Sequence, residues 1–225
     1  MIEETHFETF LYISKNKYQI FVQDKDNLKN IYNEEIEVND QIEIDNLSKF
    51  LDENIYKIEK MINNFIRNII LIIDDEKILS TNISIKKKNY EKNINEKYLE
   101  NNLIEIKDIF RENNKDHIIM HMIIVNNFLT NNKDVNDNNI FLEVNFISIS
   151  KKFTFIFDKL LEEHQIKISQ YMSGSYIKTF FSEDLAELSV VANKLNNGLN
   201  QNEVVLISKN IENKGFFEKF FQLFS

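Results

Sequence analysis

Two histidines and one acidic run are the side chains of this chain that are best suited to hold a metal ion. His117 and His121 lie four positions apart in HIIMH, so they can share one face of a strand or a helix. A zinc site needs a third and usually a fourth ligand, and the sequence has neither cysteine nor a helical HExxH motif. The acidic run Asp74, Asp75 and Glu76 follows the apolar run IILII and could hold Mg²⁺ at the carboxyl end of a strand. We interpret the first as a partly exposed strand and the second as an acidic turn.

Phosphate loops and activated nucleophiles also have few candidates. A phosphate loop needs glycines close together, whereas Gly174, Gly198 and Gly215 are the three glycines of the chain. Ser173 and Ser175 flank Gly174, but no neighbouring base marks either serine as a nucleophile, and we interpret this stretch as a turn or the start of a helix. We therefore predict no catalytic, cofactor-binding or metal-binding residues, and a protein that is not an enzyme.

Composition narrows the class of protein further. The chain has 225 residues, 43% of them hydrophobic and 28% charged, which is typical of a globular protein with a real core. Its net charge of −9 argues against nucleic-acid binding, which needs a basic surface. The absence of cysteine fits a reducing compartment. No apolar run approaches the roughly 20 residues that span a bilayer, and MIEETHFETF does not resemble a secretory signal. We expect a cytoplasmic protein.

The elements that must position these side chains alternate between two hydrophobic periods, which predicts a mixed α+β fold. We predict strands at Phe7–Ser14, Tyr18–Gln23, Ile31–Val38, Ile69–Ile73, Leu79–Ile85, Ile118–Val125, Ile140–Ile149 and Ile166–Tyr171. We predict helices from an N-cap at Asp45 to Phe65, at Asn95–Arg111, at Lys152–His164, up to Phe181, and at Leu185–Leu195. The apolar stripe of the first helix contains one polar residue, Asn54.

The order of these elements resembles a known family. Three strands that open on FLYISKNKYQIFVQD, a long helix and the buried strand in IRNIILIIDD resemble the first subdomain of actin-like proteins of the FtsA type. FtsA tethers the bacterial division ring to the membrane. DHIIMHMIIVNNFLTNN resembles part of the strand-helix-strand-strand subdomain that this family inserts, and FIFDKLLEEHQIKISQYMSGSYIKTFF resembles the return to the first subdomain. The resemblance covers residues 7 to 181 and the C-terminal tail.

The chain departs from this family at the nucleotide site. The first hairpin of the family carries an Asp-Ile-Gly-Thr-Ser type phosphate loop, and the matching positions here run from Tyr12 through Ser14 and Lys15 to Asn16, without the aspartate or the glycine. The stretch between Asp184 and Lys209 is also too short for the rest of an actin-like fold. The resemblance therefore implies a relative that has lost ATP handling and needs no cofactor.

The resemblance also implies a division of the chain into parts. We expect an incomplete actin-like (ribonuclease H-like) subdomain formed by residues 1–82 and 164–207, an inserted subdomain at 83–163, and a linker with an amphipathic helix at 208–225. The insert is expected to contact division proteins or further copies of the chain. The expected function is a non-catalytic membrane-tethering scaffold of cell division. The alternatives are an adaptor of another actin-like assembly, of the PilM type, and an unrelated metal-dependent enzyme domain.

The end of the chain, KGFFEKFFQLFS, carries the membrane-binding prediction. On a helical wheel its apolar residues fall in one sector, opposite the polar ones. A helix this short needs a surface to order it, either the protein core or a bilayer interface. The polar spacer before it and the family resemblance favour the inner face of the cytoplasmic membrane. The expected membrane-binding residues are Phe216, Phe217, Phe220, Phe221, Leu223 and Phe224.

Overall fold

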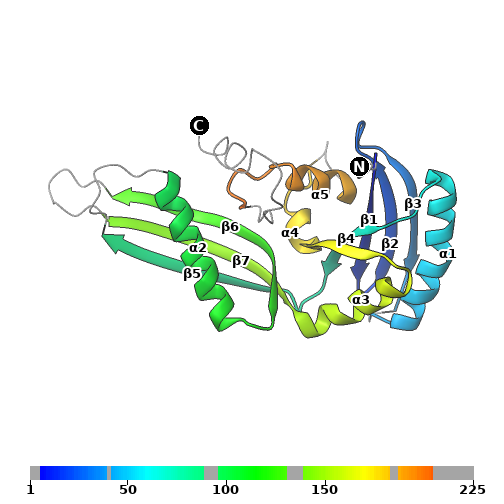
Figure 1. Cartoon of the computed structure of the whole chain (residues 1–225), viewed down its shortest axis with the longest axis horizontal. Coiled ribbons are helices and arrows are strands. Elements are labelled where there is room, and N and C mark those ends of the chain that lie inside the picture. Colours follow the sequence, from blue (N-terminus) through cyan, green and yellow to red (C-terminus); the bar gives the residue numbers. More distant parts are fainter. Residues whose placement is uncertain (1–5, 40–41, 89–95, 131–138, 183–186, 205–225) are drawn as a thin grey trace. The chain divides into compact units, whose positions relative to one another are not determined.

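The computed structural model describes residues 6–39, 42–88, 96–130, 139–182 and 187–204. Its helices and strands alternate along the chain as the hydrophobic periods predict (Figure 1). The strands are β1 (Phe7–Ser14), β2 (Lys17–Asp24), β3 (Asn30–Glu37), β4 (Asn68–Asp74), β5 (Leu79–Lys88), β6 (His117–Thr130), β7 (Asn139–Ser150) and β8 (Lys167–Ser173). The helices are α1 (Ile44–Ile62), α2 (Glu96–Asn113), α3 (Lys151–Glu163), α4 (Gly174–Lys178) and α5 (Leu188–Asn196). The predicted mixed α+β class is confirmed.

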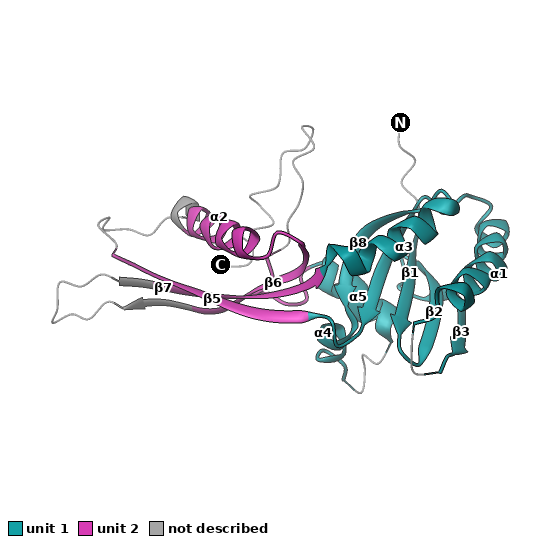
Figure 2. Cartoon of the chain, turned by 90° about the horizontal axis from the view of Figure 1, so that it is seen from below, with its two compact units in different colours: residues 1–78, 150–197 teal, residues 79–149, 198–225 magenta. Residues whose placement is uncertain are grey.

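The chain forms two compact units, each made of two separate stretches of sequence (Figure 2). Unit 1 contains Met1–Ile78 and Ser150–Asn197, and unit 2 contains Leu79–Ile149 and Gly198–Ser225. These bounds differ from the expected insert at 83–163, because α3 belongs to unit 1. The reason is that α3 packs on β8 and its residue Asp158 accepts a hydrogen bond from Tyr171 of that strand.

Unit 1 is built on a five-stranded sheet in the order β3-β2-β1-β4-β8. The first three strands form an antiparallel meander, whereas β4 pairs parallel to β1 and β8 pairs parallel to β4. β4 is a continuous run of isoleucine and leucine because both of its faces are covered, and each residue from Ile69 to Ile73 is buried. The carboxyl ends of the three parallel strands therefore meet at one edge of the sheet.

Two helices cover each face of this sheet, which makes unit 1 a three-layer structure. On one face, the hydroxyl of Tyr18 in β2 donates to the backbone oxygen of Glu43 just before α1 (3.2 Å), and α3 contacts β8. On the other face, Asn193 of α5 donates to Glu8 of β1 (3.0 Å), and α4 follows β8 directly. The faces alternate along β1 as the strand period of two requires.

Unit 2 is a three-stranded sheet in the order β5-β7-β6 with α2 on one face. The rings of Phe110 and Phe146 stack in its core with their centroids 4.5 Å apart. The other face carries a polar ladder, in which Asn145 and Asn126 donate to side chains of the neighbouring strands. The core residues are Leu103, Ile106, Phe110, Met122, Ile124, Leu142, Val144 and Phe146. None of the described helices in either unit is long and apolar enough to cross a bilayer.

The limits of α1 and α5 differ from the predictions. Helix α1 begins at Ile44, so Asp45 lies inside its first turn and is not the N-cap. The reason is that the Tyr18 hydroxyl accepts from the backbone N–H of Glu43 (2.7 Å) and fixes the chain there. The same helix ends at Ile62, because Asn63 adopts a left-handed conformation (φ 52°), and Phe65 lies beyond it, 72% exposed. α5 begins at Leu188, after the N-cap Glu187, and the predicted start at Leu185 lies outside the described residues.

Candidate functional site

The first candidate site of unit 1 lies where the parallel strands end, the edge at which open α/β sheets place their ligands. Asp74 is the last residue of β4, and its carboxylate accepts from the Tyr12 hydroxyl (3.0 Å) and from the Lys178 ammonium (2.5 Å). Lys178 also donates to the Tyr12 oxygen, at 3.0 Å. Lys178 is the last residue of α4, the helix that follows β8 in the sequence. We call this group of three side chains the edge cluster.

Backbone packing closes the space around the edge cluster. A Cβ atom added at Gly174 would lie 2.8 Å from the Cβ of Asp74 and 3.2 Å from a ring carbon of Tyr12. Contacts under 3.0 Å essentially never occur for real Cβ atoms, so the backbone at the start of α4 touches the cluster directly. Ser173 stabilises this start, because its hydroxyl accepts from the backbone N–H of Tyr176, as expected for a serine at a helix start. Of the two interpretations of this stretch, a turn or the start of a helix, the structure shows the start of a helix.

The charges at this edge are paired with one another. Partial burial alone would lower the pKa of Lys178, but its hydrogen bonds to Asp74 and Tyr12 raise the pKa above the ordinary value of 10.5. Of the two other members of the acidic run, Glu76 forms an ion pair with Lys15 (3.0 Å), and Asp75 accepts from the backbone N–H of Lys77. The three carboxylates thus point to separate partners, and they do not converge on one metal position.

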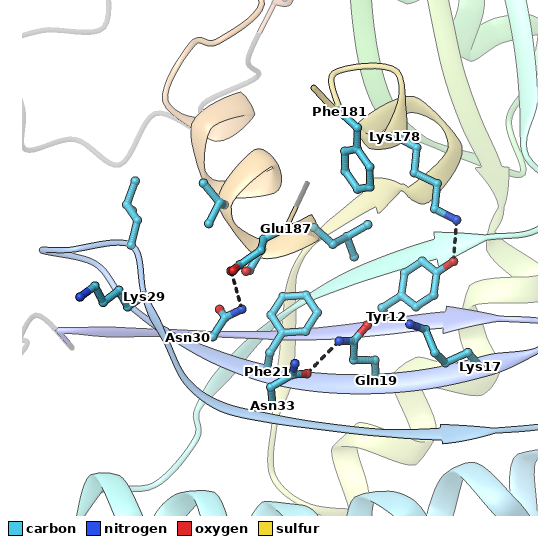
Figure 3. A pocket seen from close by; sticks show the side chains of 14 residues that line it. Tyr12, Lys17, Gln19, Phe21, Lys29, Asn30, Asn33, Lys178, Phe181 and Glu187 are labelled. Carbon is cyan, nitrogen blue, oxygen red and sulfur yellow. Dashed lines mark hydrogen bonds between the residues drawn. The ribbon is translucent and has the colours of Figure 1, made fainter. Parts of the chain in front are cut away.

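The second candidate site is a cavity of about 910 Å³ over the face of the sheet that carries α4 and α5. Figure 3 shows its side chains, with Lys178 reaching from α4 to Tyr12 at one end and Asn30 facing Glu187 at the other. We call it the sheet-face cavity. Its lining residues are Tyr12, Lys17, Gln19, Phe21, Leu28, Lys29, Asn30, Asn33, Lys178, Phe181, Glu187, Leu188, Ser189 and Val190.

Polar atoms without a partner distinguish the sheet-face cavity from the edge cluster. The hydroxyl of Ser189, a residue only 1% exposed, has no hydrogen-bond partner among the described residues, and neither has the side-chain oxygen of Asn30. The side-chain nitrogen of Asn30 donates to Glu187 at 3.2 Å. Because a carboxylate accepts only, this contact fixes which way the Asn30 amide points. Glu187 precedes α5 but makes no side-chain cap to it.

The histidine pair lies in unit 2. His117 and His121 are both on β6, so the predicted strand is confirmed, but the expected partial exposure applies to His117 and not to His121. His121 is 2% exposed, and its Nδ1 atom lies 2.6 Å from a carboxylate oxygen of Glu203. Residues next to Glu203 pair with the edge of β6, since Val204 donates to the backbone oxygen of Met122 (2.8 Å). The described residues contain no cluster of three or more side chains that could hold a metal ion.

The remaining predicted site lies outside the described residues. All six expected membrane-binding positions, from Phe216 to Phe224, belong to that part of the chain. Sequence analysis identified Asp74 and the change to Tyr12, but it did not identify Lys178, Asn30 or Ser189. One signal was available in part, because Ser189 lies on the buried side of an apolar helix, where a hydroxyl needs a partner.

Comparisons with known proteins give no family for this chain. No family model matches the chain, and no curated protein matches its sequence. Among solved structures it is similar to the cytoplasmic domain of EpsL, an inner-membrane component of the type II secretion system of Vibrio cholerae. That match has 7% identity and a TM-score of 0.37, and it covers 74% of this chain and 55% of the other.

Two other solved structures are similar to the chain. The PilM-PilN type IV pilus biogenesis complex matches with 8% identity and a TM-score of 0.46, over 77% of this chain and 49% of the other. A Bacteroides thetaiotaomicron protein of unknown function with an actin-like ATPase fold matches with 15% identity and a TM-score of 0.35, over 80% and 58%. The chain spans about half the length of the structures it matches. Likeness at this level does not assign a function.

Proposed function

We propose that this protein is a non-catalytic adaptor, which binds other proteins and does not turn over a substrate. The edge cluster is the observation that carries the proposal. Asp74 lies at the position where open α/β sheets bind their ligands, but its carboxylate already accepts hydrogen bonds from Tyr12 and Lys178. The backbone at Gly174 lies against the same two side chains, Asp74 and Tyr12. A phosphate or a metal ion would have to displace these contacts.

The charge on Lys178 argues against a catalytic role for the edge cluster. A lysine that acts as a base needs a pKa lowered toward the working pH. The pKa of Lys178 is raised instead, so the side chain stays a cation and holds Asp74 and Tyr12 in place. The three side chains therefore act as a structural lock at the edge of the sheet.

Calorimetry tests the non-catalytic proposal. The full chain is titrated with ATP and Mg²⁺, with a Lys178→Met variant beside it. We expect no heat of binding in either protein. Binding with a micromolar dissociation constant, equivalent to about 8 kcal/mol, would overturn the proposal, and so would ATP hydrolysis that is lost in the variant.

Within this class we propose an adaptor of a membrane-associated assembly. The cell-division scaffold expected from the sequence is the narrower form of this proposal, and an adaptor of the PilM type is the other. Two of the similar structures, a secretion component and a pilus complex, agree with the second form, but at TM-scores of 0.37 and 0.46 they do not decide between the two forms. A fluorescent fusion at the native locus separates the two, because a division scaffold gathers at midcell.

We also propose that the C-terminal residues attach the protein to the inner face of the cytoplasmic membrane. Each buried phenylalanine contributes roughly 1.5–3 kcal/mol before the helix-ordering cost, and the three lysines and two glutamates of the tail add little electrostatic attraction. Liposome sedimentation tests this with the full chain, a chain that ends at Lys209, and a Phe217→Glu, Phe221→Glu double variant. Only the full chain should pellet. Equal pelleting of all three would reject the tether.

A further inference from the structure

We propose that the sheet-face cavity is the docking site for a short peptide segment of a partner protein. A backbone amide of that segment meets Ser189 and Asn30, an apolar side chain lies against Phe181 and Leu188, and a carboxylate approaches Lys29. This inference rests on the adaptor function proposed above and names the site and the chemistry of its partner.

The first support is the pair of polar atoms without partners. Leaving a buried polar group without a hydrogen bond costs free energy, so native proteins keep few of them. Ser189 and Asn30 come from α5 and β3, and both line the same cavity. Two such atoms at one cavity indicate that a ligand supplies the missing hydrogen-bond partners.

The chemistry of the two atoms selects an amide group. The Asn30 oxygen accepts only, because its nitrogen is held by Glu187, so the ligand must bring a hydrogen-bond donor. The Ser189 hydroxyl can donate to a carbonyl oxygen. A peptide bond carries one N–H and one C=O, whereas a phosphate monoester at neutral pH offers almost only acceptors. A peptide therefore fits this pair of atoms better than a phosphate does.

The rest of the lining suits a side chain of the same peptide. The accessible apolar surface comes from Leu28, Phe181, Leu188 and Val190, and Phe181 is 38% exposed. The cavity volume of about 910 Å³ lies at the upper end of the range for ligand sites, roughly 300–1,000 Å³. Ser189 and the Asn30 oxygen are shielded from solvent in this conformation, so the peptide must turn a lining side chain aside to reach them.

The charges point to a single carboxylate on the peptide. Lys17 and Lys178 line the cavity, but each already forms an ion pair, with Glu35 and Asp74 respectively. The exposed ammonium of Lys29 has no ion pair with any described residue, which leaves it for the ligand. Glu187 disfavours a second acidic group beside Asn30.

Selection from a library of random heptapeptides displayed on phage tests the inference. The full chain serves as bait, and the affinity of the enriched peptides, made synthetically, is then measured by fluorescence anisotropy. We expect peptides that combine an apolar residue with one acidic residue. Ser189→Ala should weaken them about five- to tenfold, since it removes one hydrogen bond, and Lys29→Gln should weaken them about threefold.

The controls separate docking from an effect on folding. Lys25→Gln removes an exposed lysine from the same β2–β3 connection, at a position that does not line the cavity, and should leave the affinity unchanged. The melting temperature of each variant is measured beside its affinity. Selection without enrichment, or peptides that bind the Ser189→Ala and Lys29→Gln variants as well as the parent, would overturn the inference. Either result leaves the non-catalytic adaptor intact, because only nucleotide binding or turnover contradicts it.

Discussion

The edge cluster and the sheet-face cavity lie on the same face of one sheet and share Tyr12 and Lys178. They differ in whether their polar groups have hydrogen-bond partners. In the edge cluster, Asp74 receives two hydrogen bonds, and the backbone packs against it. In the cavity, Ser189 and Asn30 each keep an atom that has no hydrogen-bond partner in the part of the chain that the structure describes. The contrast shows that the polar groups at the carboxyl ends of the strands are satisfied within the protein, whereas two polar atoms of the cavity are left for the proposed ligand.

The largest change in stability is expected from Gly174→Ala, which adds a methyl group against the edge cluster. The new Cβ would lie 2.8 Å from the Cβ of Asp74, and neither atom can move without a shift of backbone. We expect a loss of about 2 kcal/mol in the free energy of unfolding, measured by urea denaturation. Gly198→Ala is the control, because it has open space but a φ of +88°, and it should lose only about 1 kcal/mol. Equal losses would mean that the edge is not tightly packed.

Ser173 and Ser189 are both buried, and they allow the two sites to be compared through the same substitution. Ser173 caps α4 through its hydroxyl, so Ser173→Ala should lose about 1 kcal/mol of stability. Ser189 has no partner to lose, so Ser189→Ala should be neutral or stabilise by up to about 1 kcal/mol. Thermal and urea unfolding of the two variants give the difference directly. A clear destabilisation by Ser189→Ala would show that its hydroxyl already has a partner in the free protein.

The smallest effect concerns the charge on Lys178 and appears only at alkaline pH. The folded-state pKa of Lys178 is raised above 10.5, so its contribution is complete below pH 10.5 and is lost as the pH rises through the folded-state pKa. Because the Lys178 side chain is 45% exposed, that contribution is below about 1 kcal/mol. The stability advantage of the parent over Lys178→Met should stay constant up to pH 10.5 and then shrink. An advantage that grows with alkaline pH would contradict the assignment.

Sequence patterns predicted the fold better than they predicted the sites. The run IILII was recognised as a strand buried on both faces because hydrophobicity is a local property of consecutive residues. Likewise, the polar position Asn54 in α1 was identified, and the structure explains it through its hydrogen bonds to Tyr32 and Phe50. Element ends were less predictable, since Tyr18 fixes the start of α1 through a contact 25 positions away.

Both candidate sites depend on contacts over still longer separations. Lys178 meets Asp74 across 104 positions, and Asn30 meets Glu187 across 157. No periodicity in one sequence encodes such a pairing, and a serine in a helix gives no sign that it lacks a partner. The family resemblance drew attention to Tyr12 as a position that departs from a phosphate loop. The hydrogen bond from Lys178 to Tyr12, in contrast, follows only from the way β8 and α4 return to the sheet.

The division of unit 1 into two stretches has a consequence for the order of folding. Pairing β8 with β4 joins residues about 100 positions apart, as Ser169 and Ile69 are, and closing so long a loop is slow. Within unit 2, Leu79 pairs with Ser148, so the folding of that unit brings the two ends of the intervening chain together. The loop left to close is then about three times shorter, which lowers its entropic cost by roughly 1 kcal/mol. We therefore expect that folding of unit 2 accelerates the pairing of β8 with β4, which completes the five-stranded sheet.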